Sequence, residues 1–324
     1  MRKMIFALIV AAVLLTTGRI GFCSPAPDKG EGEKSSKNIK IVATVFPVYD
    51  FTRAVVGDAA NLSMLVRPGV EIHTYDPSPQ DILSIHNADV FIYVGGESDA
   101  WVDVLLGSSE LAGKTVLRLI DRVDAVEEEL VEGMQPEEEE EGEEGEEEEE
   151  YDEHIWTSPR NAMTLVRSIA ETLCQVDPKN AETYRANAKG YIDEIAKIDE
   201  EFKALVASAK RKKIVFGDRF PFRYFADEFG LEYRAAFPGC HTESDVSAAT
   251  MAYLVKAVQN ESIPVVYTIE LSSQNIAKAI AEQTGAEVVT LHSCHTVTRT
   301  EFESGVTWLS LMKGNVESLR KGLN

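Results

Sequence analysis

Three histidines lie far apart along the chain, each in a loop-like segment beside proline or serine. They are His73 in RPGVEIHTYDPSP, His154 in DEHIWTSP and His292 in LHSCH. Neutral imidazoles are ligands for zinc, and residues this far apart form a metal site only when folding brings them together. The sequence lacks the H-E-x-x-H signature of helix-borne zinc hydrolases, so we expect a metal that is bound and takes no part in catalysis.

The other histidines are weaker candidates. His295 lies three residues after His292 and is the alternative ligand from the same segment. His241, in FPGCHTESD, is expected in a loop, and His86, in DILSIHNAD, on the surface of a helix. The first hypothesis is therefore a site built from His73, His154 and His292.

The cysteines suggest one disulfide. Cys174 stands at an apolar position of the helical segment SIAETLCQV and is expected to be a buried free thiol. Cys240 and Cys294 both stand in loop-like segments of a chain that we expect to be exported. A bond between these two would stabilise the fold by about 4 kcal/mol if its effect is to restrict the unfolded chain. We therefore predict a disulfide between Cys240 and Cys294.

Residues 1–24 have the character of an export signal. Two cationic residues precede an apolar run at residues 4–15, which suits a signal peptide and is too short to span a bilayer stably. A retained membrane anchor is the alternative, because Arg19 and Phe22 interrupt the small-residue pattern of a cleavage site, and Cys23 is a candidate for lipid attachment. Residues 25–38 are predicted to be a flexible tether. The folded part is then extracytoplasmic, in the periplasm or on the outer face of the cell membrane.

Negative charge is concentrated in one segment. The chain has a net charge of −22, and residues 127–153 contain 18 acidic and no basic residues. Without those 18 charges the rest of the chain is only mildly acidic. Such a run repels itself and has little apolar surface to bury, so it is predicted to be a disordered loop that either gathers cations or keeps the protein soluble. Nothing in the composition favours a nucleic-acid partner.

The elements that must position these residues follow an alternating pattern. Apolar β-branched runs alternate with amphipathic helical stretches, which is typical of βαβ units and parallel sheets. A long helix is predicted within residues 177–210, because Asp177 and Pro178 suit its start and apolar residues recur at helical spacing after them. The chain is therefore predicted to be an α/β protein with two similar lobes, residues 39–176 and 211–324, each with a four-stranded parallel sheet flanked by helices, joined by that helix. The candidate strands are residues 39–46, 62–66, 90–94, 115–119, 213–217, 233–237, 265–269 and 287–291.

Five segments carry a resemblance to a known family. They are VFPVYDFTRAVVGD, PGVEIHTYDPSPQDI, ADVFIYVGGESDAW, DEHIWTSPRNA and TWLSLMKGNVESL. In combination they resemble the zinc and manganese solute-binding proteins of ABC transporters, above all through His-x-Tyr-x-Pro-x-Pro followed by His-x-Trp-x-x-Pro. The resemblance runs from about residue 39 to residue 324. It implies a metal held in the cleft between two α/β lobes, with a charged or His-rich loop before the second histidine.

The resemblance also implies a set of ligands. His73 and His154 match the two ligands of the first lobe, and His292 stands where the family usually has an aspartate of the second lobe. The remaining family ligand, a histidine or glutamate, falls on Arg219, whose guanidinium cannot bind a cation. Either the neighbouring Asp218 takes its place or water does. The predicted metal ligands are therefore His73, His154, His292 and Asp218.

Zinc is the expected metal, because a nitrogen-rich set of ligands suits Zn²⁺, and manganese is the alternative. The implied function is that of a monomeric, extracytoplasmic subunit that captures zinc and delivers it to the permease of an ABC transporter. We expect no enzymatic activity, since neither a nucleophile elbow nor a phosphate loop is present. A metal-dependent hydrolase and a surface adhesin that uses the acidic run are the other classes considered.

Overall fold

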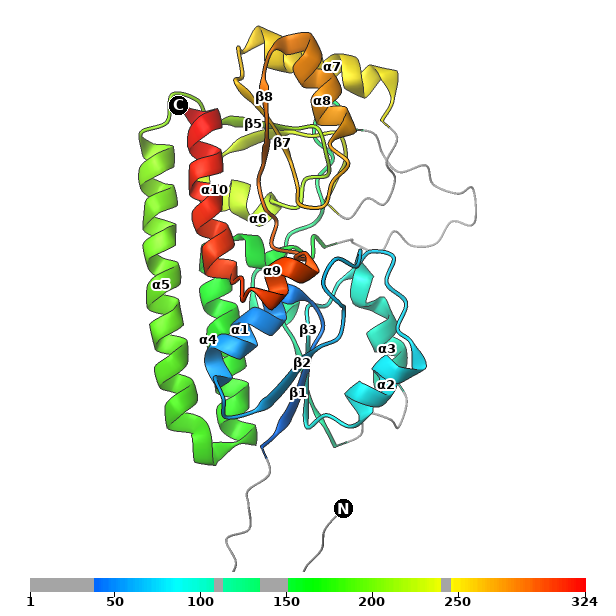
Figure 1. The fold of residues 1–324 in the computed structure, drawn as a ribbon, viewed down its shortest axis with the longest axis vertical. Coiled ribbons are helices and arrows are strands. Elements are labelled where there is room, and N and C mark those ends of the chain that lie inside the picture. Colours follow the sequence, from blue (N-terminus) through cyan, green and yellow to red (C-terminus); the bar gives the residue numbers. More distant parts are fainter. Residues whose placement is uncertain (1–37, 108–112, 135–150, 240–245) are drawn as a thin grey trace, which may run out of the picture. The chain divides into compact units, whose positions relative to one another are not determined.

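A computed structural model describes residues 38–107, 113–134, 151–239 and 246–324 (Figure 1). The predicted signal peptide, nearly all of the predicted tether and residues 135–150 of the acidic run lie outside these ranges, as do Cys240 and His241. Within them, no helix combines the length and the apolar character needed to cross a membrane.

The first sheet is built from four short strands, all parallel. One of its two central strands, β3, has the sequence VFIY and is buried along its whole length, as expected for a parallel sheet that is covered on both faces. In spatial order the strands are β2 (Asn61–Met64), β1 (Lys40–Ala43), β3 (Val90–Tyr93) and β4 (Thr115–Arg118). The connecting helices are α1 (Phe46–Val56), α2 (Pro79–His86) and α3 (Ala100–Leu106).

The second sheet repeats this arrangement, again with four parallel strands. The order is the same, with the second strand of the set at one edge and the first beside it. The strands are β6 (Glu232–Arg234), β5 (Lys213–Phe216), β7 (Val265–Thr268) and β8 (Glu287–Thr290), and the connecting helices are α6 (Arg223–Phe229), α7 (Ala248–Asn260) and α8 (Asn275–Thr284). The predicted fold class is thus confirmed.

The helix between the two sheets is α5 (Ala181–Ala207), which follows a single 3₁₀ turn at Pro178–Asn180. Its 27 residues correspond to about 40 Å at 1.5 Å per residue. Helix α5 packs against α1, α4 (Pro159–Val176) and α10 (Trp308–Leu323) (Figure 1). We call the part of the described chain before α5 the N lobe and the part after it the C lobe.

The two lobes are joined by polar contacts of buried tryptophans as well as by a shared apolar core. The Trp308 amide of α10 donates to Asp50 Oδ2 of α1 at 2.8 Å, and the Trp308 indole donates to the carbonyl of Trp156 at 3.2 Å. The Trp156 indole in turn donates to the Ser293 carbonyl at 2.9 Å. These contacts hold the segment after β8 against the segment that enters α4.

The described ends of the acidic run are structured, which corrects the prediction of disorder for residues 127–134 and 151–153. Glu127 forms an antiparallel bridge with Tyr151. Glu129 pairs with Arg223, and Glu132 lies 3.6 Å from the Arg234 guanidinium. Carboxylates in a run of like charge become ordered here because C-lobe arginines face them.

Candidate metal centre

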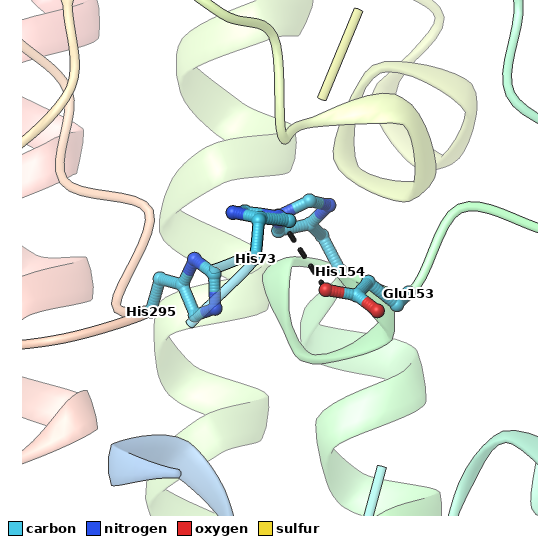
Figure 2. A group of neighbouring side chains, drawn as sticks. All are labelled: His73, Glu153, His154 and His295. Carbon is cyan, nitrogen blue, oxygen red and sulfur yellow. Dashed lines mark ion pairs between the residues drawn. The ribbon is translucent and has the colours of Figure 1, made fainter. Parts of the chain in front are cut away.

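Four side chains that can bind a metal converge where the strands of both sheets end. They are His73 from the loop after β2, Glu153 and His154 from the segment after β4, and His295 from the loop after β8 (Figure 2). One ligand atom from each residue lies within 4.8 Å of the others. Ligand sites of parallel α/β sheets form at the carboxyl ends of strands, and here two sheets contribute to one site.

The three imidazoles each have an Nε2 atom that is buried and without a hydrogen-bond partner. In His154 and His295 the whole residue is buried, and the side chain of His73 is only 4% exposed. Buried polar atoms normally have partners, so three orphaned nitrogens in one group indicate an intended ligand. His73 Nε2 also lies 3.4 Å from Glu153 Oε1, the pair marked in Figure 2.

His73 is oriented by a carboxylate on the other side of its ring. Glu71 Oε1 lies 2.7 Å from His73 Nδ1, and Glu71 Oε2 accepts from the Arg219 guanidinium at 2.8 Å. Burial by itself would raise the pKa of Glu71, but the hydrogen bonds from His73 and Arg219 bring that pKa far below its usual range. An ionised Glu71 accepts the Nδ1 proton, which leaves the Nε2 lone pair for a metal.

His154 has an equivalent support. Asp152 Oδ1 accepts from the His154 amide at 2.7 Å and lies 3.0 Å from its Nδ1. Burial lowers the pKa of His154, but the Asp152 charge and hydrogen bond outweigh it, so the pKa is raised. The backbone carbonyl of Asp152 accepts from the Tyr224 hydroxyl of the C lobe at 2.7 Å.

Glu153 is fixed by Ser98, whose amide and hydroxyl donate to its two carboxylate oxygens at 3.1 and 2.5 Å. This approach requires glycine at position 96. Gly96 has φ 138°, and a Cβ there would lie 2.8 Å from Glu153 Cβ. The Glu153 carboxylate is thereby held beside the three rings, with its oxygens close enough to share a metal with them.

His295 depends on the backbone of its loop. Glu270 accepts from the Ser293 amide at 2.7 Å, the Ser293 hydroxyl at 2.6 Å and the His295 amide at 3.1 Å. Between them, Cys294 adopts φ 63°, a left-handed conformation that is uncommon for residues other than glycine. Burial brings the pKa of His295 well below its ordinary value, so this imidazole is neutral and ready to bind a metal.

The structure brings together two of the four predicted ligands and places the other two elsewhere. The His292 backbone forms two 2.8 Å hydrogen bonds with the Asn315 side chain, and His292 Nδ1 accepts from the Cys294 amide at 2.9 Å. The turn at Cys294 separates the two histidines of this loop, so that His295, the alternative from the sequence, joins the group in place of His292.

Asp218 is likewise outside the group. Its carboxylate accepts from the backbone amides of Arg219 at 2.9 Å and Ile269 at 3.3 Å, and burial raises its pKa. The carboxylate in the group is that of Glu153. Its position next to His154 in the sequence is the one local indication of this role.

The predicted disulfide also needs correction. Cys294 is a buried free thiol whose sulfur lies 3.7 Å from the His292 carbonyl, while Cys240 lies outside the described residues. Cys174 is a buried free thiol, as predicted, and lies 3.4 Å from the Ala181 carbonyl.

Comparison with known proteins identifies the family of the chain. Residues 41–322 match the family described as zinc-uptake complex component A, periplasmic (ZnuA). The chain is 29% identical over 316 residues to the high-affinity zinc uptake system protein ZnuA of Bacillus subtilis, covering 97% of this chain and 96% of that protein. It is 30% identical over 287 residues to the zinc-binding protein AdcA of Streptococcus pyogenes, covering 87% of this chain and 55% of AdcA. The chain therefore spans about half the length of the AdcA relatives.

A solved structure of a similar protein has the same fold. The Zn(II)-bound ZnuA-like domain of Streptococcus pneumoniae AdcA superposes with a TM-score of 0.72 at 28% sequence identity, covering 88% of this chain and 99% of that domain. The similarity thus includes both lobes and α5.

Proposed function

The chain belongs to the zinc-uptake complex component A family, and from this membership we propose that it is the extracytoplasmic zinc-binding subunit of an ABC transporter. It captures Zn²⁺ between its lobes and delivers the ion to a membrane permease. The single observation that carries the proposal is the group of three buried, unpartnered Nε2 atoms beside the Glu153 carboxylate. The protein acts as a monomer, and Cys23 is its candidate lipid attachment point.

The composition of the site favours zinc over manganese. Three imidazole nitrogens and one carboxylate oxygen match the nitrogen-rich tetrahedral coordination of Zn²⁺, whereas Mn²⁺ suits oxygen-rich sites. Zinc–nitrogen bonds of about 2.0–2.1 Å place neighbouring ligand atoms about 3.4 Å apart. The four ligand atoms, all within 4.8 Å of one another, need only a small contraction around the ion.

The same arrangement argues for binding rather than hydrolysis. A catalytic zinc keeps one position open for water, while a closed site uses four protein ligands. His73, Glu153, His154 and His295 supply four. In the proposed set of ligands, His295 takes the place of His292 and Glu153 takes the place of Asp218.

Metal analysis of the purified protein tests the proposal. We expect one zinc per chain by mass spectrometry, and competition with a chromogenic chelator should show much weaker binding of manganese. His295→Ala should remove tight binding, whereas His292→Ala should retain most of it, with His86→Ala on α2 as the matched control. Equal affinity for the two metals would reject the preference, and full zinc affinity in His295→Ala would reject the ligand set.

A further inference from the structure

Arg219 of the C lobe lies directly behind a ligand of the N lobe. Its side chain follows β5, is 18% exposed, and donates from Nη2 to Glu71 Oε2 at 2.8 Å. Its Nη1 lies 3.3 Å from His73 Nδ1. Both atoms are donors when Nδ1 carries its proton, so the shorter contact of Nδ1 with the Glu71 carboxylate, at 2.7 Å, sets the tautomer. A guanidinium has no lone pair for a metal, so its proximity to the site calls for a role other than that of a ligand.

Glu71 connects Arg219 to the imidazole. Glu71 Oε1 faces the His73 ring at Nδ1 and also accepts from the backbone amide of Ile72 at 3.1 Å. The Glu71 side chain is 44% exposed, so water competes for its carboxylate. The ion pair with Arg219 restricts the carboxylate to the orientation in which it accepts the Nδ1 proton, because a guanidinium binds a carboxylate in a defined geometry.

We propose that Arg219 is a positioning residue for zinc capture: through Glu71 it holds His73 in the tautomer protonated on Nδ1, with Nε2 free for the metal. The inference rests on the proposed function only in naming the metal as zinc. Because Arg219 comes from the C lobe and His73 from the N lobe, the N-lobe ligand is fully oriented only when the two lobes are together. Lobe contact and ligand orientation are thereby coupled.

The positive charge of Arg219 could instead weaken zinc binding, and this alternative provides the contrast for a test. A cation beside the site repels an incoming dication, so if repulsion were its main effect, removing the charge would strengthen zinc binding. The positioning role requires the opposite sign. Loss of a group that orients a metal-binding histidine typically weakens metal binding by about 10- to 100-fold.

The experiment compares Arg219→Met, which keeps the aliphatic stem, with Arg219→Lys, which restores a charge and a donor. Arg320→Gln removes a surface ion pair with Glu317 on α10 and is the matched control. We expect zinc affinity to fall about tenfold in Arg219→Met, with faster release in stopped-flow measurements, and to recover partly in Arg219→Lys. In a Glu71→Ala background, Arg219→Met should have little further effect, because both act through one contact.

The tautomer provides a measurement that does not depend on zinc. In long-range ¹H–¹⁵N spectra of metal-free protein labelled at histidine, His73 should be protonated on Nδ1 in the wild type and in Arg320→Gln, and should become a mixture of tautomers in Arg219→Met. Unchanged or tighter zinc binding in Arg219→Met, or an unchanged His73 tautomer, overturns the proposal. A wild-type protein that binds no zinc would instead reject the proposed function, while the tautomer result would still decide the role of Arg219.

Discussion

The N lobe and the C lobe support their ligands in different ways. In the N lobe, His73 and His154 each have a carboxylate on the ring nitrogen that faces away from the site, Glu71 and Asp152 respectively. In the C lobe, the carboxylate of Glu270 binds the main chain around His295. The N-lobe carboxylates therefore orient rings while each also accepts from a neighbouring backbone amide, whereas Glu270 binds no ring of the group and controls the path of a loop.

This difference separates two properties of the site. A carboxylate that binds a ring nitrogen fixes the tautomer and raises the basicity of the ligand, so it acts mainly on metal affinity. A carboxylate that binds backbone amides satisfies donors that would otherwise be buried and unpaired, so it acts on stability as well. Variants of the two kinds of carboxylate should therefore differ in how much they change zinc affinity and how much they change the free energy of unfolding.

The largest effect is expected for Glu270→Gln. The amide group of the variant presents donors to the Ser293 amide, which leaves buried donors unpaired, so the free energy of unfolding should fall by about 3 kcal/mol together with zinc affinity. Denaturant unfolding of the metal-free protein measures the first quantity. Glu303→Ala, which removes a surface ion pair with Arg299, is the control. A Glu270→Gln protein with wild-type stability would break the distinction between the lobes.

Asp152→Asn should change affinity more than stability. The asparagine can turn its NH₂ group toward His154 Nδ1 and donate to it. This contact favours the tautomer with the proton on Nε2, and that proton blocks Nε2 from binding the metal. We expect zinc binding to weaken by about 10- to 100-fold. The unfolding free energy of the metal-free protein should fall less than in Glu270→Gln, because only one backbone amide, that of His154, loses its acceptor. A loss of stability as large as that of Glu270→Gln would show that both lobes use their carboxylates alike.

Proton competition should begin in the N lobe. Zinc binds neutral imidazole, and the pKa of His154 is raised while that of His295 is well below its ordinary value. As the pH falls through the raised pKa of His154, zinc affinity should drop by about tenfold per pH unit for the one proton displaced. His295 should add a second proton only in much more acidic medium. Chelator competition across pH measures the slope, and a two-proton slope near neutrality would contradict this order.

The smallest effect is expected for deletion of residues 135–150, which leaves the ordered ends of the acidic run intact. If these charges gather cations, zinc capture should slow at low ionic strength and converge with the wild type in high salt, with the equilibrium affinity unchanged. Stopped-flow capture rates at two salt concentrations provide the measurement. Equal rates at low salt would favour a role in solubility.

Much of the fold was accessible from the sequence because its determinants are local. Most strands are short runs with β-branched residues, the edge strands β2 (NLSM) and β6 (EYR) being the exceptions. Helix α5 begins four residues after the predicted start at Asp177 because a 3₁₀ turn comes first. His73 and His154 were accessible for the same reason, since each stands in a short local motif, His-x-Tyr-x-Pro-x-Pro and His-x-Trp-x-x-Pro respectively.

The remainder of the site depends on backbone conformations that residue types do not reveal. The choice between His292 and His295 is decided by the left-handed turn at Cys294, a conformation that a sequence rule would assign to glycine. Glu153 joins the site because Gly96 lets Ser98 approach it closely, a contact between segments 55 residues apart. Such non-local contacts have no signature in a single sequence.

The bond between Asp50 and Trp308 has a consequence for how the chain folds. It joins residues 258 positions apart, and Arg53 also donates to the Val306 carbonyl at 3.2 Å from the same helix. Helix α1, formed early in synthesis, can reach its final contacts only after α10 has been made. Folding that requires such long-range closure is slow compared with local helix formation. The nascent chain should therefore remain incompletely folded until translation of α10, a window in which proteases and chaperones can act on it.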